Sequence, residues 1–202
     1  MLVNKRIYFL LLFSLASLCA LSQEFTSLPG KRGSYSLVAY VNGGGGFFAS
    51  KKGMPAYLYP EANRFNPIGT VRILWFPDHL IKVGLESGKI DFYSYRLKDS
   101  AGTPGNISLS AIPLILVWSM SVTRHFNIFA GSGAYLLTTR LDYKQRSVAR
   151  KLSVGWMAAA SYIVPLSADT GIGAEAKWLY AAETSNGSLC LQLQFVWKFL
   201  KW

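Results

Sequence analysis

The sequence predicts an all-β fold: a single transmembrane, up-and-down antiparallel β-barrel of about eight strands, preceded by a signal peptide. The first observation is an every-second-residue apolar series at residues 189–199, which includes Phe195 and Trp197. A strand sends successive side chains to opposite faces, so one face of this segment is apolar throughout. The second observation is the composition, which is 51% hydrophobic and 14% aromatic. No segment after the leader is apolar for long enough to make a transmembrane helix, whereas a lipid-facing barrel requires alternation on every strand.

The N-terminal segment is typical of a secretory signal peptide. Two basic residues precede an apolar run at residues 7–18, and small residues follow it. This run is too short for a retained membrane anchor, and we expect cleavage between Ser22 and Gln23. The predicted organisation is therefore a signal peptide at residues 1–22 and one outer-membrane β-barrel domain at residues 23–202.

The charge balance favours anionic surroundings. Removal of Lys5 and Arg6 with the leader lowers the net charge of +11 by two, to +9. Such a balance suits nucleic acid or the phosphates of a membrane surface, and export argues against nucleic acid. Cys190 is the one cysteine expected after cleavage, so no intramolecular disulfide is predicted. It is expected to face inward as a small apolar side chain.

The N-terminal half is predicted to hold four strands. Residues 34–48 indicate the first strand, which ends in four glycines, and residues 49–65 form the longest loop. Apolar alternation on both sides of residues 77–79 predicts a hairpin with a three-residue turn. This turn places Trp75 opposite Ile81 and leaves charged side chains on the other face, with Arg72 diagonal to Lys82 and Glu86. The fourth strand, at residues 106–122, is weakened locally by Pro113.

The C-terminal half is predicted to hold four more strands. Residues 125–143 form the fifth, whose lipid-facing side the pattern does not decide, and residues 151–164 and 171–182 form the next two. Asn186-Gly187 is a strong signal for a two-residue hairpin turn. Taken as the turn, this pair places Trp178 opposite Phe195 outside the barrel and Glu175 opposite Lys198 inside it.

Eight strands place both termini at one end of the barrel, which is the periplasmic end in outer-membrane barrels. Aromatic residues gather near that end of the predicted strands, where an interfacial girdle belongs. They are Trp75, Phe76, Trp118, Phe126, Tyr162, Trp197 and Phe199. The strand either ends at Phe199 or continues to Trp202, which is out of phase with the preceding aromatics. The alternative fold is a soluble β-sandwich, which also produces alternation.

Two segments carry a resemblance to a known family. The sequence reads SLSAIPLILVW at residues 108–118 and FNIFAGSGAYLLTTRLDYK at residues 126–144. These resemble the outer-membrane β-barrel (porin-family) domain common in Bacteroidetes, in which an IPL strand precedes a GxGxY strand. The resemblance extends over most of the mature chain. It implies a Gram-negative cell, localisation to the outer membrane and insertion by the barrel-assembly machinery.

An eight-stranded barrel is only wide enough for its own side chains to fill the interior. The inward-facing charges mix both signs and are predicted to pair with one another as a hydrogen-bonded plug. A narrow polar pore lined by the same residues is the alternative. The predicted interior charge network is Arg72, Lys82, Glu86, Glu175, Lys177 and Lys198, with Gln192 and Gln194 beside it.

Basic residues also gather in the predicted outward loops, beside the phosphates of lipopolysaccharide. Ordinary solvated loop charge is the alternative interpretation. The set is Lys51, Lys52, Arg64, Lys144, Arg146, Arg150 and Lys151.

The sequence offers little chemistry for catalysis. The two histidines, His79 and His125, fall in predicted periplasmic turns, away from an outer rim where acyl transfer on lipid would occur. No metal cluster, nucleotide motif or cofactor is predicted. We therefore expect a non-enzymatic barrel with a structural or surface-interaction role, in contact with outer-membrane lipid, lipopolysaccharide and an unidentified protein. The alternatives are a barrel subunit of a secretion or motility machinery, a narrow pore, or a lipid A-modifying enzyme.

Overall fold

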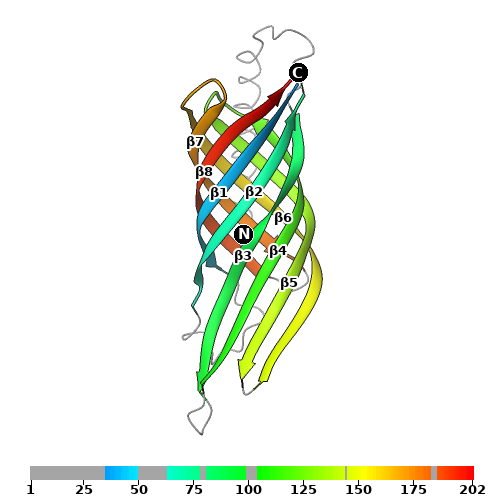
Figure 1. Ribbon diagram of the computed structural model, residues 1–202, viewed down its shortest axis with the longest axis vertical. Helices are drawn as coiled ribbons and strands as arrows, with labels where there is room; N and C mark the ends of the chain where they lie inside the picture. Colours follow the sequence, from blue (N-terminus) through cyan, green and yellow to red (C-terminus); the bar gives the residue numbers. More distant parts are fainter. Residues whose placement is uncertain (1–34, 50–62, 78–80, 99–103, 144, 183–185) are drawn as a thin grey trace, which may run out of the picture.

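Eight antiparallel strands form one closed barrel in the computed structural model, which describes residues 35–49, 63–77, 81–98, 104–143, 145–182 and 186–202. Each strand pairs with its neighbours in the sequence, and the first closes onto the last (Figure 1). No helix among these residues is long and apolar enough to cross a bilayer. The predicted all-β, up-and-down barrel is confirmed, whereas the predicted signal peptide lies outside the described residues. The strands are β1 (Ser36–Phe48), β2 (Phe65–Phe76), β3 (Ile81–Lys98), β4 (Pro104–Ser121), β5 (Phe126–Tyr143), β6 (Gln145–Pro165), β7 (Thr170–Ala181) and β8 (Asn186–Lys201).

Alternation along the strands separates an apolar outside from a mixed inside. Exposed and buried residues alternate strictly through most of β2, and large apolar side chains such as Leu193, 76% exposed, point outward. On β5, Ile128 and Leu136 face outward while Phe129 and Tyr135 are buried, which settles the face that the sequence pattern left open. The outward belt has the composition required of a surface in contact with lipid tails.

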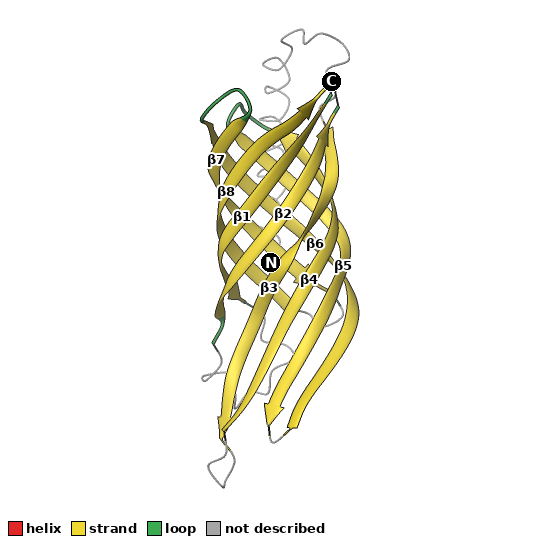
Figure 2. Cartoon of the chain, viewed as in Figure 1, coloured by secondary structure: helices red, strands yellow, loops and turns green. Residues whose placement is uncertain are grey.

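Strands β3 to β6 extend beyond the closed ring at the end opposite the C-terminus (Figures 1 and 2). Ladder pairing between β2 and β3 stops at Ile68 and Ile90, whereas β3 and β4 remain paired as far as Lys98 and Pro104. Pairing between β6 and β7 starts only at Gly155. The result is a four-stranded projecting sheet, defined here as residues 91–98, 104–110, 138–143 and 145–153.

The register of β2 against β3 differs from the predicted one by two residues. Trp75 pairs with Val83 instead of Ile81, and Arg72 lies directly opposite Glu86. The predicted hairpin with residues 77–79 as its turn is therefore wrong, because that turn requires Trp75 to lie opposite Ile81. The faces are unaffected, since a shift by an even number of residues returns every side chain to the same side of the sheet.

The register of β7 against β8 differs by six residues. Trp178 pairs with Leu189 instead of Phe195, and Glu175 pairs with Gln192 instead of Lys198. Asn186-Gly187 is part of β8 and not the turn. Gly187 instead leaves room for the Trp178 ring, because a Cβ atom at this position would lie 2.8 Å from the ring atom Cζ2.

An irregularity in the closing ladder explains the change of phase near the C-terminus. Leu37 of β1 pairs with Leu200, and the adjacent Val38 pairs with Lys198, so Phe199 is the extra residue of a bulge. Beyond it, Trp202 exchanges two backbone hydrogen bonds with Tyr35, of 2.9 and 3.0 Å. The closing strand therefore continues past Phe199, and Trp202 faces outward.

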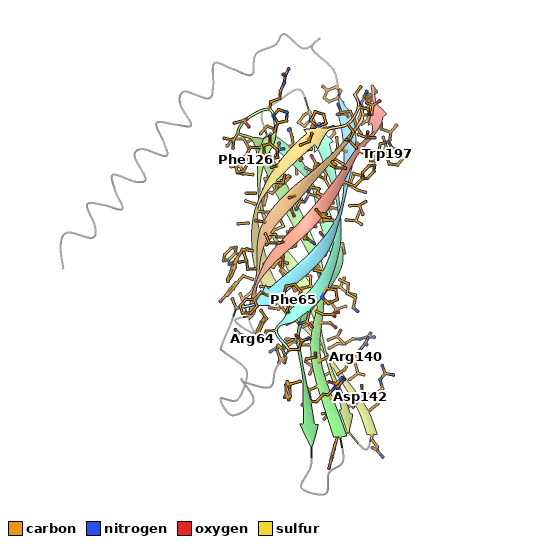
Figure 3. All side chains as sticks on the ribbon, turned by 90° about the vertical axis from the view of Figure 1, so that its left-hand side faces the viewer. Arg64, Phe65, Phe126, Arg140, Asp142 and Trp197 are labelled. Atoms are coloured by element: carbon orange, nitrogen blue, oxygen red, sulfur yellow. The ribbon has the colours of Figure 1, made fainter. Side chains whose placement is uncertain are left out.

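The aromatic girdle forms at the end where the chain termini of the described region meet. Figure 3 shows Phe126 and Trp197 at this end, far from Arg140. Phe76 and Phe199 depart from the prediction, because both are half-buried: Phe76 packs against the interior, and Phe199 is the extra residue of the bulge. The exposed members of the predicted girdle are Trp75, Trp118, Phe126, Tyr162 and Trp197.

Candidate functional site

Four charged side chains meet inside the barrel and form a closed ion-pair quartet. Arg72 of β2 bonds Glu86 of β3 at 2.6 Å and Glu175 of β7 at 2.8 and 3.1 Å. Lys177 of β7 bonds the same two carboxylates, at 2.5 Å and 2.8 Å. All four side chains are fully buried. Two positive and two negative charges alternate around the cycle, so the quartet is neutral.

Polar neighbours occupy further hydrogen-bonding positions around the quartet. The Gln194 amide donates to Glu175 at 3.1 Å, and the Lys177 ammonium donates to the Thr70 hydroxyl at 3.1 Å. The Asn42 amide donates to the same hydroxyl. Buried charges are tolerated when they are paired and hydrogen-bonded in this way.

Two predicted members of the interior network lie outside the quartet. Lys82 faces inward but donates to the Ser121 hydroxyl at 2.6 Å, and its ammonium lies 4.2 Å from the centre of the Phe76 ring. Lys198 lies on β8 near the C-terminal end of the barrel and does not reach Glu175. The predicted Glu175–Lys198 pairing is wrong because it depended on the misplaced turn.

Apolar side chains fill the interior around the quartet. The Arg72 guanidinium lies 4.1 Å from the centre of the Phe129 ring, and Phe48 packs edge-on against Phe92 with ring centres 5.8 Å apart. Cys190 is fully buried, as predicted, and is the ladder partner of Lys177. Two hollows, of about 610 and 420 Å³, are lined chiefly by outward-facing apolar residues. The geometry fits a plugged barrel better than a pore.

The outer surface of the projecting sheet carries a cluster of three arginines. Arg140 of β5 pairs with Val148 of β6, which places Arg146 and Arg150 diagonally on either side of it. All three are exposed. Diagonal neighbours in an antiparallel ladder are about 7–8 Å apart, within reach of long side chains. Asp142 lies beside them and pairs with Arg146 at 3.7 Å, so the cluster keeps a positive charge (Figure 3).

The predicted basic loop residues divide into three groups. Arg146 and Arg150 face outward on β6, whereas Lys151 lies on the opposite face of the same strand. Arg64 folds back, donating to the Phe48 carbonyl at 3.1 Å with its guanidinium 4.8 Å from the centre of the Phe47 ring. Lys51, Lys52 and Lys144 lie outside the described residues. Arg140 was missed because the sequence did not determine the faces of β5.

One of the two histidines, His125, lies within the described residues. His125 lies in the turn between β4 and β5, where its ring packs on Tyr162 at 5.7 Å. His79 lies outside the described residues. Among the described residues, no group of three or more His, Cys, Asp or Glu side chains is placed to hold a metal ion.

A closed ring of eight strands, apolar outside and charge-paired inside, defines an integral membrane β-barrel of the outer-membrane class. No family model and no curated protein matches the sequence. Among solved structures, the fold is similar to Neisserial surface protein A, with 13% identity, coverage of 83% of this chain and 99% of that chain, and a TM-score of 0.50.

Two further structures are similar at lower scores. Ail, the attachment invasion locus protein of Yersinia pestis, was solved in complex with the heparin analogue sucrose octasulfate. It is 9% identical, with coverage of 81% of this chain and 98% of that chain and a TM-score of 0.49. The outer membrane protein OprG from Pseudomonas aeruginosa is also 9% identical, with coverage of 83% and 99% and a TM-score of 0.48. At these identities, the comparisons concern the fold alone.

Proposed function

We propose that this protein is a non-enzymatic outer-membrane barrel with a surface-interaction role, and that the outer face of its projecting sheet binds the phosphates of lipopolysaccharide. The barrel lies with the described chain termini at the periplasmic end and the projecting sheet outside the cell. The observation that carries this proposal is the cluster of Arg140, Arg146 and Arg150, on a face that continues the lipid-facing surface of β5 and β6.

The position of this cluster favours a lipid phosphate over a soluble anion. On β5, the outward series runs from Ile128 and Leu136 to Arg140, so the surface changes from apolar to cationic along a single strand. On β6, the same change runs from Val154 and Leu152 to Arg150. A lipid that packs its chains against the apolar part brings its phosphates level with the guanidinium groups. Guanidinium groups bind phosphate oxygens in a bidentate manner.

The test is the binding of lipopolysaccharide to the purified, folded protein in detergent, before and after enzymatic removal of the lipid A phosphates. The triple variant R140Q/R146Q/R150Q should lose about 3 kcal/mol of binding free energy, at about 1 kcal/mol per basic residue, which is roughly a hundredfold in affinity. Lys151→Gln is the matched control, because this residue lies on the other face of β6. Equal affinity of the triple variant and the control for phosphorylated lipid would contradict the proposal.

From the sequence resemblance, we propose a Bacteroidetes-type porin-family barrel from a Gram-negative cell, inserted by the barrel-assembly machinery. The basic and apolar N-terminal pattern supports export by a signal peptide at residues 1–22. Lack of enzymatic activity is supported by the place of His125 in a turn at the end away from the projecting sheet. Mass spectra of lipid A from cells with and without the protein should be identical.

A second candidate is a barrel subunit of a secretion or motility machinery, and the edge of β6 favours it. The Val154 carbonyl accepts a hydrogen bond from the amide of Ala182, the residue after β7. Alternate residues of β6 towards the tip, from Leu152 to Arg146, therefore direct their backbone groups to the same side of the strand. Among the described residues, β7 supplies no ladder partner to β6 before Gly155. An extended segment of a partner could add to such an edge. Recovery of the barrel alone from crosslinked outer membranes would exclude this candidate.

A further inference from the structure

A second group of interior charges lies at the end of the barrel where Tyr35 and Trp202 meet, here called the terminal mouth. Lys82 of β3 and Lys198 of β8 both face inward there, from strands that are three apart around the ring. Both side chains are half-buried. Unlike the quartet, this pair consists of two positive charges, and their electrostatic interaction is repulsive.

The side-chain carboxylates of the described residues are engaged elsewhere. Glu86 and Glu175 are bound within the quartet. Asp91 pairs with Lys89 on the outer surface, and Asp142 pairs with Arg146. Asp169, on the connection between β7 and β6, forms its ion pair with Lys201. Within the described region, Lys82 therefore has a hydroxyl and an aromatic ring as its neighbours, and no ion pair is found there for Lys198.

The wall beside Lys82 carries a hydrogen-bonding group without a partner. Ser119 is the direct ladder partner of Lys82 and is only 3% exposed, and its hydroxyl makes no hydrogen bond within the described residues. Side chains of direct ladder partners have Cβ atoms about 4.5–5.5 Å apart. Next to it, the Ser121 hydroxyl bonds both the Lys82 ammonium and the Asn127 amide oxygen, at 2.6 and 2.7 Å. This network holds the Lys82 ammonium in place beside Ser119.

Apolar groups separate the terminal mouth from the quartet. Phe129 and Leu74 are almost fully buried, and the Phe129 ring packs directly on the Arg72 guanidinium. The quartet is neutral and compensated, so it does not offset the charge of the two lysines. Like charges held in a partly buried site are costly unless an opposite charge joins them.

We propose that the terminal mouth binds a small oxyanion of the phosphate class, held by the ammonium groups of Lys82 and Lys198 and by the Ser119 hydroxyl. A tetrahedral oxyanion accepts hydrogen bonds in several directions, which matches inward-facing donors supplied by β3, β4 and β8. The ligand is either free phosphate or the phosphate of a lipid headgroup, since this end of the barrel lies near one surface of the membrane. The proposal does not depend on the arginine cluster of the projecting sheet.

The experiment is calorimetric titration of the folded protein, in a phosphate-free detergent, with inorganic phosphate, with chloride at the same ionic strength, and with a short-chain phosphatidylglycerol. Lys82→Gln and Lys198→Gln should each weaken the binding of the phosphate ligand at least tenfold, and Ser119→Ala should weaken it several-fold. Lys201→Gln is the matched control, because Lys201 pairs with Asp169 and should leave the affinity within twofold of the original.

The lysine variants should fold, because each removes a repulsive charge, and the heat-dependent shift on a detergent gel checks this. Binding of inorganic phosphate that depends on the two lysines identifies a free anion, whereas lysine-dependent binding of the lipid alone identifies the headgroup. The proposal is overturned if neither phosphate ligand binds more tightly than chloride, or if a folded K82Q/K198Q variant binds as well as the unmodified protein.

Discussion

Substitution of Glu175 by Gln should destabilise the barrel strongly, because it leaves the quartet with a net positive charge. The carboxylate accepts hydrogen bonds from Arg72 at 2.8 and 3.1 Å, lies 2.8 Å from the Lys177 ammonium and bonds Gln194 at 3.1 Å. Gln keeps the shape and one acceptor but removes the charge. Removal of one partner from a buried ion pair costs about 3–5 kcal/mol, which is a large part of the 5–15 kcal/mol that is typical of folded domains.

A double variant that restores the charge balance of the quartet provides the control. In the double variant E175Q/K177M, one negative and one positive charge are lost together, and Arg72 remains paired with Glu86. We therefore expect the double variant to be more stable than E175Q alone by about 2 kcal/mol, although it carries more substitutions. The free energy of unfolding is measured by urea titration in lipid vesicles, with tryptophan fluorescence as the signal. If the double variant were no more stable than E175Q, charge balance would not be what holds the quartet together.

Three further predictions concern the barrel wall. Leu193→Arg, in the middle of the outward face of β8, should lower the free energy of unfolding by about 2–4 kcal/mol. For Trp197→Arg, near the end of the strand, the introduced charge should cost only about 0–1 kcal/mol. Equal urea midpoints for the two variants would refute the assigned lipid depth. Gly155→Ala should destabilise by about 1–3 kcal/mol, because its Cβ would lie 2.6 Å from the Tyr135 ring and meet the Tyr180 carbonyl. Gly43→Ala, with nothing within 4 Å, should be neutral in the same urea titration. In a Cys190→Ala background, the A176C/L191C variant should form a disulfide under mild oxidation, because these residues are ladder partners. The A176C/W197C variant should not form one. The opposite result on non-reducing gels would support the register predicted from sequence.

The sequence predicts the faces of the strands much better than their partners. Alternation assigns Trp75, Trp178 and Leu193 to the outside, and the structure confirms each assignment. Both predicted hairpins nevertheless have the wrong register, by two and by six residues. Side chains alternate between the two faces every second residue, so a shift by an even number of residues leaves the apolar pattern unchanged. Asn186-Gly187 predicts a turn, whereas Gly187 makes space for the Trp178 ring. Such a contact depends on the neighbouring strand and has no local signature.

The interior site was predicted in composition but not in arrangement. Arg72, Glu86, Glu175 and Lys177 were all expected to face inward and pair, and they do. Lys82 and Lys198 were grouped with them because alternation carries no information about height along the barrel axis. Strand tilt and register determine that height, and both are properties of the closed ring.

The quartet also constrains the order in which the barrel can form. Arg72 and Glu175 are separated by 103 residues, and Lys177 and Glu86 by 91, so Arg72 and Glu86 each gain a second ionic partner only with the seventh strand. Before that, Arg72 and Glu86 can pair only with each other in the β2–β3 ladder, and Lys177 and Glu175 only with each other within β7, on faces that will become the inside of the barrel. Insertion of an open, partly assembled sheet into lipid would expose them to hydrocarbon. Completion of the quartet therefore coincides with the arrival of the seventh strand at the second and third, and a half-built barrel has an electrostatic reason to stay out of the membrane.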